Sequence, residues 1–151
     1  MDKSQTIKTE VEALLGKMIN KFEVEVTEEE GVYQVIVKAD EEASTVIGRH
    51  GETIRAIQKI LEVIFYKSFG EATNILVNVN DYREKQKERL ESMASDYASR
   101  AVSSQEPVEI RGLSSYERKL IHEYVTKNHP GLTSESTGEG KDRRLVISVK
   151  K

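Results

Sequence analysis

Two glycines that enclose a pair of cationic residues form the tetrapeptide with the clearest chemical potential in this sequence. Gly48-Arg49-His50-Gly51 lies between two stretches whose apolar residues recur at helical spacing. Glycine adopts backbone angles closed to other residues and lets a ligand approach the main chain. The start of the next helix offers unpaired N–H groups and a positive dipole. The segment is therefore a candidate phosphate-binding loop, in which Arg49 and His50 add donors. A plain corner between two helices is the structural alternative, and for a bare GxxG the more frequent one.

A second pair of cationic side chains recurs at helical spacing in the C-terminal half. Arg118 and His122 are four positions apart, so a helix over 114–127 places both on one side. Such a pair binds an anion, or it is an ordinary solvated helix face with a stray histidine. His122 and His129 do not have the spacing of a zinc-binding helix, so we expect no metal.

Apolar periodicity predicts the elements that must position the glycine loop. Helical spacing favours helices, and period-two alternation favours strands. The predicted elements are a helix over 4–20, a hairpin of strands over 22–26 and 32–39, helices over 42–47 and 54–69, and a strand over 74–80. Their order is helix, strand, strand, helix, helix, strand, with the glycine loop between the two central helices.

The remaining residues predict a second, smaller group of elements. The stretch 81–104 is highly charged yet keeps a thin apolar stripe, which indicates a helix that acts as a rigid connector. The segment 103–107, which ends in proline, is the clearest boundary. A strand over 108–110, the helix that carries Arg118, and two strands around Leu132 and over 145–149 follow. Ser114 and Glu117 have the spacing of a capping box at the start of that helix.

The surroundings of the glycine loop resemble a known nucleic-acid-binding domain. Residues 47–54, Ile-Gly-Arg-His-Gly-Glu-Thr-Ile, resemble the I-G-x-x-G-x-x-I signature of the KH domain. The predicted element order is similar to the type II, prokaryotic arrangement of that domain. In KH domains the GxxG loop clamps the backbone of about four nucleotides. The resemblance covers residues 1–80 and implies that the loop contacts RNA.

The helix with Arg118 also has surroundings that resemble a known family. Residues 113–122 are similar to the helix of the Arg-x-x-x-His single-stranded nucleic-acid-binding domain, and residues 134–139 and 143–147 resemble its closing strands. The resemblance covers about 105–149. It implies that Arg118, His122 and Arg143 form one cationic face.

A KH domain followed by an Arg-x-x-x-His domain resembles the bacterial Jag family, also called KhpB. The resemblance implies an α+β fold with a KH domain over 1–80, a connecting helix over 81–104 and an Arg-x-x-x-His domain over 105–151. Family members commonly carry a further N-terminal domain, whereas here the first predicted helix starts close to the first residue.

The function that this resemblance implies is binding of single-stranded RNA, with a regulatory role in bacterial cell shape and division. The expected RNA-binding residues are Gly48, Arg49, His50, Gly51, Arg118, His122 and Arg143. The GxxG loop is not followed by the Lys-Ser/Thr of a nucleotide-binding P-loop, so we expect no enzyme and no cofactor. The alternative is a protein-interaction module, in which the KH domain forms a homodimer or pairs with a small KH protein.

Composition excludes several classes of protein but does not exclude nucleic acid as a partner. Among 151 residues there is no cysteine, which excludes disulfides and thiolate chemistry. No apolar run approaches the length of a membrane span, so we expect a cytoplasmic protein without membrane insertion. The net charge of -3 is an average: residues 1–80 have 9 Lys and Arg against 14 Asp and Glu, and residues 81–151 have 14 against 12. Arg49, Arg118, Arg143 and Arg144 remain as local cations.

Overall fold

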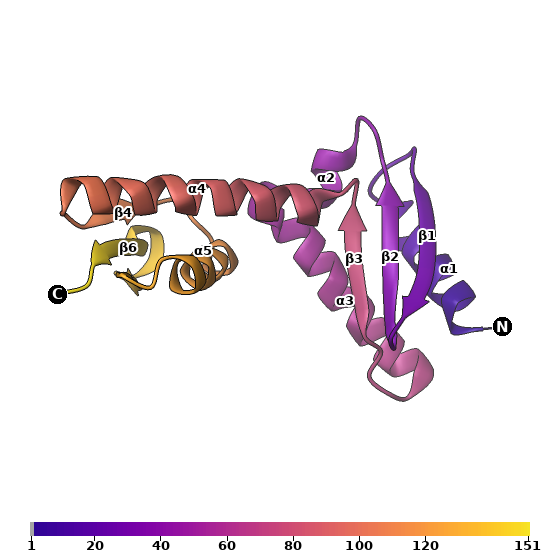
Figure 1. The fold of residues 1–151 in the computed structure, drawn as a ribbon. Helices are drawn as coiled ribbons and strands as arrows, with labels where there is room; N and C mark the ends of the chain where they lie inside the picture. The colour runs from indigo at the N-terminus through magenta and orange to yellow at the C-terminus, as the bar shows by residue number, and fades with distance from the viewer. Residues whose placement is uncertain (1) are drawn as a thin grey trace. The chain divides into compact units, whose positions relative to one another are not determined.

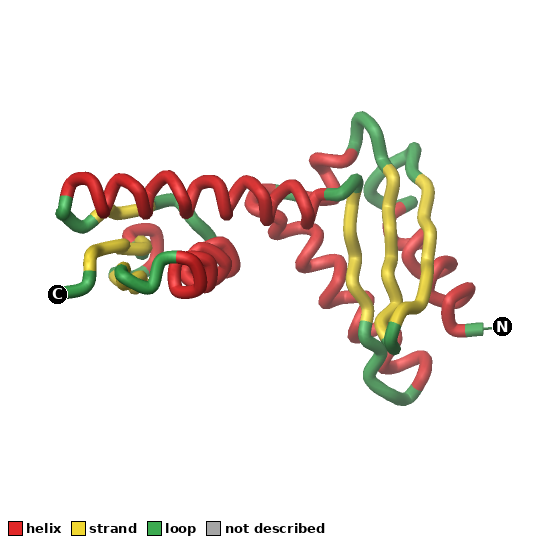
Figure 2. Tube along the Cα trace, in the orientation of Figure 1, coloured by secondary structure: helices red, strands yellow, loops and turns green. Residues whose placement is uncertain are grey.

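The computed structural model describes residues 2–151 and separates into two units, one ending at Arg83 and the other comprising Glu84–Lys151. Each unit has its own three-stranded sheet and its own apolar core. Figure 1 shows the fold, and Figure 2 shows how helices and strands alternate along the chain. The α+β fold class predicted from the sequence is confirmed.

The first unit has the predicted order of helix, strand, strand, helix, helix, strand. Its elements are α1 (Lys3–Leu15), β1 (Glu23–Glu29), β2 (Val32–Lys38), α2 (Ala43–Ile47), the short 3-10 helix η1 (Arg49–Gly51), α3 (Glu52–Phe69) and β3 (Ile75–Val79). The first helix ends five residues earlier than predicted. Gly16 follows its last residue, and the apolar residues beyond it, including the buried Ile19, lie in a turn instead of a helix.

The sheet of the first unit runs in the order β1-β2-β3. β1 and β2 pair antiparallel through a tight turn at Glu30 and Gly31, whose φ angles of 50° and 82° suit a two-residue hairpin. β2 and β3 pair in parallel, so the chain must cross over between them. α2, η1 and α3 make that crossover, and the glycine loop therefore lies within it.

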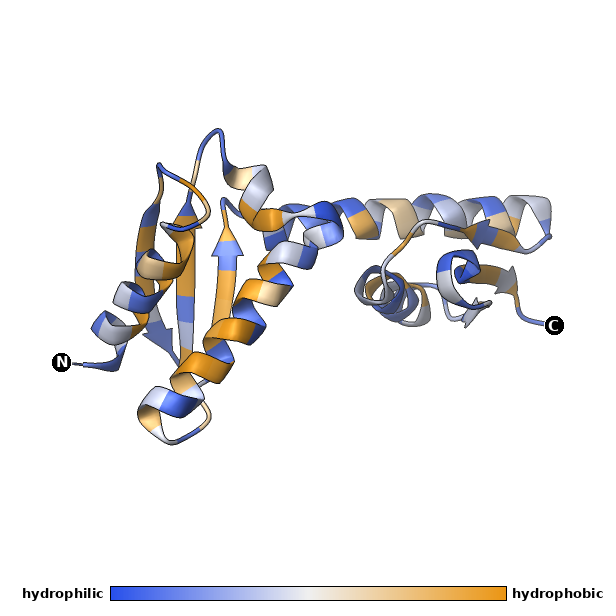
Figure 3. Cartoon of the chain, turned by 180° about the vertical axis from the view of Figure 1, so that it is seen from behind, coloured by the Kyte–Doolittle hydropathy of each residue, from blue (hydrophilic) through white to orange (hydrophobic). Residues whose placement is uncertain are grey.

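The core of the first unit lies between the sheet and two helices. α1 and α3 cover one face of the sheet, as the opposite views of Figures 1 and 3 both show. Valines on neighbouring strands meet in register on that face, with Val35 beside Val77 and Val37 beside Val79. Leu61 and Phe65 of α3 are fully buried against them. Burial of these apolar side chains stabilises the folded unit through the hydrophobic effect.

The second unit combines two helices with a small antiparallel sheet. α4 (Tyr82–Ser104) begins in the first unit and continues into the second, where it is followed by β4 (Val108–Ile110), α5 (Ser115–Asn128), β5 (Leu132–Thr137), the 3-10 helix η2 (Gly140–Asp142) and β6 (Arg144–Val149). The strands have the order β4-β6-β5. Within residues 2–151, no helix is both long and apolar enough to cross a membrane.

The apolar stripe of α4 belongs to the core of the second unit. Leu90 and three alanines on one side of the helix are buried with Ile121, Leu145 and Ile147; the alanines are Ala94, Ala98 and Ala101. Sequence analysis assigned 81–104 to a connector between two domains. The difference arises because the buried residues of the helix are mostly alanines, so they join the apolar core although the mean hydropathy of the helix is low.

A buried carboxylate joins α4 to the start of α5. Glu117 is 0% exposed, and its Oε2 accepts hydrogen bonds from Gln86 Nε2 at 3.1 Å and Arg89 Nη2 at 3.0 Å. Its Oε1 accepts from the backbone N–H of Ser114 at 2.9 Å, while the Ser114 hydroxyl accepts from the Glu117 N–H at 3.2 Å. The predicted capping box is therefore present, and it also connects the two helices.

We expect Glu117→Ala to lower the free energy of unfolding by about 2–4 kcal/mol, because the Gln86 amide and the Ser114 N–H lose their acceptor. Urea denaturation followed by circular dichroism measures this loss. Glu123→Ala is the matched control on the same helix, since its carboxylate is 58% exposed and 4.0 Å from Lys119. The control should change the free energy by less than about 0.5 kcal/mol. Equal effects of the two variants would contradict a stabilising role for the buried network.

Candidate nucleic-acid interface

Gly48 closes the first half of the glycine loop against the start of α3. Its φ of 73° lies in the region that favours glycine, and its N–H donates to Ser44 O at 2.9 Å, which ends α2. A Cβ at this position would lie 2.1 Å from Thr53 Oγ1 and 2.7 Å from Thr53 Cβ. No side chain fits into that space, so the loop requires glycine here.

Gly51 closes the second half of the loop. It is left-handed, with a φ of 74°, and immediately precedes the first residue of α3. A Cβ here would lie 2.9 Å from the Tyr82 hydroxyl and 3.4 Å from Arg55 Nη1. Tyr82 therefore supports the loop from the start of α4, a role that the sequence did not indicate. In the sequence, only the Asp81-Tyr82-Arg83 segment could have indicated this role of Tyr82.

The arginine and the histidine of the loop differ in their surroundings. Arg49 is exposed, whereas His50 is half-buried and has a positive φ of 55°. The carbonyl of His50 accepts a hydrogen bond of 2.8 Å from Arg55 Nη1. The first turn of α3 thus holds the loop backbone, while Arg49 points a guanidinium at solvent beside it.

The end of β3 is tied to α3 next to this loop. Arg83 donates from Nε to Val77 O at 2.7 Å and from Nη2 to Gln58 Oε1 at 2.9 Å. The same Gln58 oxygen accepts from the Val77 N–H at 3.0 Å. β3 is an edge strand, and these side chains satisfy backbone groups at its outer edge. The chain that leads to Tyr82 is held in place by the same contacts.

In the second unit, the structure brings three predicted site residues to one hollow. Arg118 and His122 on α5 and Arg143 after η2 line a hollow of about 360 Å³. Lys119 lines it as well, although sequence analysis did not single it out. None of the described residues that line this hollow is Asp or Glu. The arrangement attracts anions, because several positive groups lie together without a carboxylate to neutralise them.

Backbone carbonyls orient the two guanidinium groups. Arg118 Nη1 donates to Leu113 O at 2.7 Å, and Arg143 Nη1 donates to Gly138 O at 2.8 Å. Gly138 has a φ of 91°, and a Cβ there would lie 2.7 Å from the Asp142 carbonyl oxygen. The turn that presents Arg143 therefore requires this glycine. Each guanidinium keeps further N–H donors for a ligand.

Arg144 does not join this hollow, although it is adjacent to Arg143. Its Nε donates to Glu109 Oε1 at 3.1 Å, an ion pair between β6 and β4. Arg143 lies between η2 and β6, whereas Arg144 is the first residue of β6 and is opposite Thr137 of β5. Of the two neighbouring cations, only Arg143 lines the candidate site.

Three serines complete the lining of the hollow. They are Ser115 at the start of α5 and, on β5, Ser134 and Ser136. Sequence analysis did not single them out, because a run of polar residues in 133–137 looks like an ordinary solvated strand. The available signal was their spacing: residues 134 and 136 lie on the same face of β5 as the buried Leu132.

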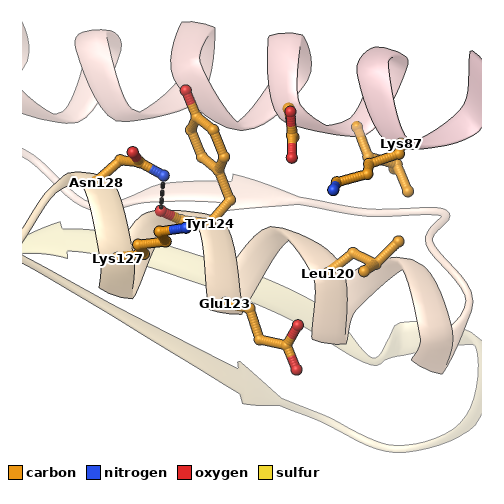
Figure 4. A pocket seen from close by; sticks show the side chains of 8 residues that line it. Lys87, Leu120, Glu123, Tyr124, Lys127 and Asn128 are labelled. Carbon is orange, nitrogen blue, oxygen red and sulfur yellow. Dashed lines mark hydrogen bonds between the residues drawn. The ribbon is translucent and has the colours of Figure 1, made fainter. Parts of the chain in front are cut away.

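A second hollow between α4 and α5 has a mixed lining. Figure 4 shows Tyr124 extending from α5 towards α4, with Asn128 Nδ2 donating to Tyr124 O at 3.0 Å. The hollow is about 350 Å³ in volume, and its lining includes two lysines, Lys87 and Lys127, and two glutamates, Glu91 and Glu123. Equal numbers of both charges give no preference for an anion. The hollow with Arg118 is therefore the better candidate.

Comparison with known families places both units. Residues 6–79 match the KH domain of KhpA and KhpB, and residues 88–149 match the Arg-x-x-x-His domain. The chain thus combines a KH domain with an Arg-x-x-x-His domain, as the resemblance implied. The second match starts within α4, in agreement with the burial of that helix in the second unit.

The chain is also similar to curated proteins that are named RNA-binding protein KhpB. The chain is 28% identical over 153 residues to the RNA-binding protein KhpB of Bacillus subtilis, with 100% of this chain and 73% of that protein covered. It is 32% identical over 105 residues to the RNA-binding protein KhpB of Lactiplantibacillus plantarum, with 70% of this chain and 32% of that protein covered. It is 28% identical over 148 residues to the RNA-binding protein KhpB of Streptococcus pneumoniae D39, with 96% of this chain and 45% of that protein covered. The chain therefore spans less than half of two of these relatives. It belongs to the KhpB family of proteins with KH and Arg-x-x-x-His domains.

Gly48→Ala tests the close approach within the glycine loop. Gly70 is a comparison for positive φ alone: its φ is also 73°, but its ψ is 7° against 175° at Gly48, and no atom lies within 4 Å of an added Cβ. We expect Gly70→Ala to cost about 1 kcal/mol of unfolding free energy from backbone strain alone. Gly48→Ala should cost about 1–3 kcal/mol more, because the added methyl group overlaps Thr53 and the backbone angles of Gly48 are nearly closed to alanine. Equal losses in urea denaturation would show that the loop does not need its contact with α3.

Proposed function

We propose that the chain binds single-stranded RNA without catalysing a reaction, through one site in each domain. The hollow lined by Arg118, Lys119, His122 and Arg143 is the observation that carries this proposal. Oriented guanidinium groups in a site without carboxylates suit the phosphates of a nucleic acid strand. The relatives described above are named as RNA-binding proteins, which favours RNA over DNA.

The KH loop supplies the second site of this proposal. The loop lies directly before the first residue of α3, where the N–H groups and the dipole of a helix start favour a phosphate. Arg49, which is exposed, adds a positive charge at the same point. The loop holds the backbone and leaves the bases of a single strand accessible for stacking and hydrogen bonding.

Two modest sites on one chain give a higher affinity than either alone. When the first site holds a strand, the second encounters it at a high effective concentration, provided that the strand reaches both. Loss of either site then lowers the overall affinity without abolishing binding. A regulatory role fits this behaviour, since RNA is held and released without chemical change.

Variants of each site test the proposal by fluorescence anisotropy with a fluorescein-labelled single-stranded RNA of mixed sequence. The double variant Arg49→Asp/His50→Asp should weaken binding at least tenfold, equivalent to about 1.4 kcal/mol. Arg118→Ala should also weaken binding. It should reduce the slope of log affinity against log salt by at most about 0.7, the contribution of one phosphate contact on a single strand.

Circular dichroism of each variant shows whether the fold is retained. Arg111→Ala is a matched control for Arg118→Ala, because that exposed guanidinium pairs with Glu109 and does not line the hollow. It should bind as the unaltered protein does. Unchanged affinity and salt dependence in both site variants would exclude these sites from RNA binding. A DNA strand of the same sequence, bound equally well, would remove the preference for RNA.

A second candidate function is contact between KH domains, as a homodimer or with a separate small KH protein. Three large apolar side chains on α3 are exposed, namely Ile60 at 48%, Val63 at 61% and Tyr66 at 62%. Figure 3 shows that apolar residues recur along this helix. Lys59 and Glu62 beside them carry opposite charges, so two copies of the face attract each other when they pack antiparallel.

Val63→Asp should disrupt this contact, because a carboxylate would be buried at its centre. Light scattering at a protein concentration of about 100 µM measures this, since even a dimer with a micromolar dissociation constant is populated at that concentration. The unaltered chain should have the mass of a dimer, and the variant should have a mass near that of the monomer. Ser68→Asp, an exposed position on the same helix, adds the same charge outside the patch. A monomer mass for the unaltered chain, alone and with an added small KH protein, would rule out this function.

A further inference from the structure

The hydroxyl of Ser134 is buried at the hollow of the Arg-x-x-x-His domain and makes no hydrogen bond with any described residue. Ser134 is only 6% exposed. The preceding residue behaves differently, since the Thr133 hydroxyl pairs with that of Ser148 at 2.8 Å. Buried polar groups are almost always hydrogen-bonded in folded proteins, because an unpaired one lowers stability. Ser134 is therefore an exception that calls for a physical reason.

The position of Ser134 on β5 explains why none of the residues that the structure describes bonds to its hydroxyl. Leu132, Ser134 and Ser136 share one face of the strand and pass from the apolar core to the exposed rim of the hollow. The cross-strand neighbour of Ser134 is Ile147, which is fully buried and has no side-chain polar group. An alanine would fill this position without an unpaired hydroxyl. The serine thus supports something other than packing.

The cations of the hollow indicate which ligand the hydroxyl meets. Arg118 and His122 come from α5 and Arg143 from the turn before β6, so they line the same hollow as Ser134 from other elements. A phosphate group has several oxygens that accept hydrogen bonds in different directions. Guanidinium groups at the rim of the hollow can donate to the phosphate oxygens that face outward. A neutral hydroxyl on β5 can donate to a phosphate oxygen that faces inward.

We propose that the Ser134 hydroxyl donates a hydrogen bond to a phosphate oxygen of the RNA strand held by Arg118 and Arg143. This inference rests on the proposed function of the Arg-x-x-x-His domain. In the protein without RNA, each of these guanidinium groups is bonded to a backbone carbonyl. Because the hydroxyl is buried, side chains that line the hollow must move when a phosphate binds to it. The stability lost through the unpaired hydroxyl is then recovered when RNA binds.

Ser134→Ala separates this role from a structural one, because the variant should bind RNA more weakly without losing stability. Affinity for the labelled single-stranded RNA should fall at least about tenfold, the loss expected for a hydrogen bond to a charged acceptor. The salt slope should stay unchanged, since no counterion-releasing charge is removed. The melting temperature without RNA should stay the same or rise.

Thr133→Val is the matched control on the same strand. It removes a hydroxyl that is already paired on the opposite face, so it should lower the melting temperature and leave RNA affinity unchanged. Arg118→Ala provides the reference for loss of a charge, with a smaller salt slope. Together the three variants distinguish a neutral ligand group, a structural group and a cationic ligand group.

Each result decides for or against the proposal. Weaker binding with an unchanged salt slope and no loss of melting temperature supports it. Wild-type affinity in Ser134→Ala, with Arg118→Ala impaired, overturns the role of Ser134 and leaves the proposed function intact. A lower melting temperature in Ser134→Ala would mean that the residue is structural. Unimpaired binding by Arg118→Ala, or no binding by the unaltered chain, would refute the proposed function itself.

Discussion

The buried carboxylate of Glu117 is the interaction on which the architecture of the second unit depends. A charge without access to water is tolerated only where several donors compensate it. Gln86 and Arg89 of α4 and the backbone of Ser114 supply those donors, so the carboxylate holds two helices together and fixes where α5 begins. Arg118 is the next residue along the chain, and its guanidinium bonds back to Leu113 in the same turn. The candidate anion site is thus positioned by a negative charge that is itself shielded from the ligand.

The first unit positions its site through backbone geometry instead of charge. Parallel pairing of β2 and β3 forces a crossover, and α2 and α3 must both lie within it. The chain has only a four-residue loop between those helices, and Thr53 on one side and Tyr82 on the other leave no room for a Cβ at its two ends. The crossover of the sheet therefore sets where the loop lies, and the contacts with Thr53 and Tyr82 set which residues its ends accept.

Local patterns predicted the order of elements, the capping box and the glycine loop, because these features depend on residues a few positions apart. Features that depend on distant residues were missed. Gln86 and Arg89 are 31 and 28 positions from Glu117, and nothing in α4 indicates that its charged sequence faces a buried carboxylate. The alanine stripe of α4 has too little hydropathy contrast to show that the helix is part of a core. Ser134 was overlooked because its burial follows from the packing of α5 on the sheet and is not encoded in the polar run around it.

Net charge is a poor guide to what such a chain binds, because screening makes charges beyond a Debye length of about 8 Å nearly independent at physiological salt. Three of the 26 acidic residues are Glu28, Glu29 and Glu30, at the hairpin tip between β1 and β2. Another, Glu117, is buried and paired with Arg89, and Glu109 pairs with Arg144. Carboxylates that are paired or placed in this way do not neutralise the charges of Arg118 and Arg143. None of the described residues that line their hollow is acidic. An acidic chain therefore retains an anion site wherever its acidic residues are used to build the fold around the cations.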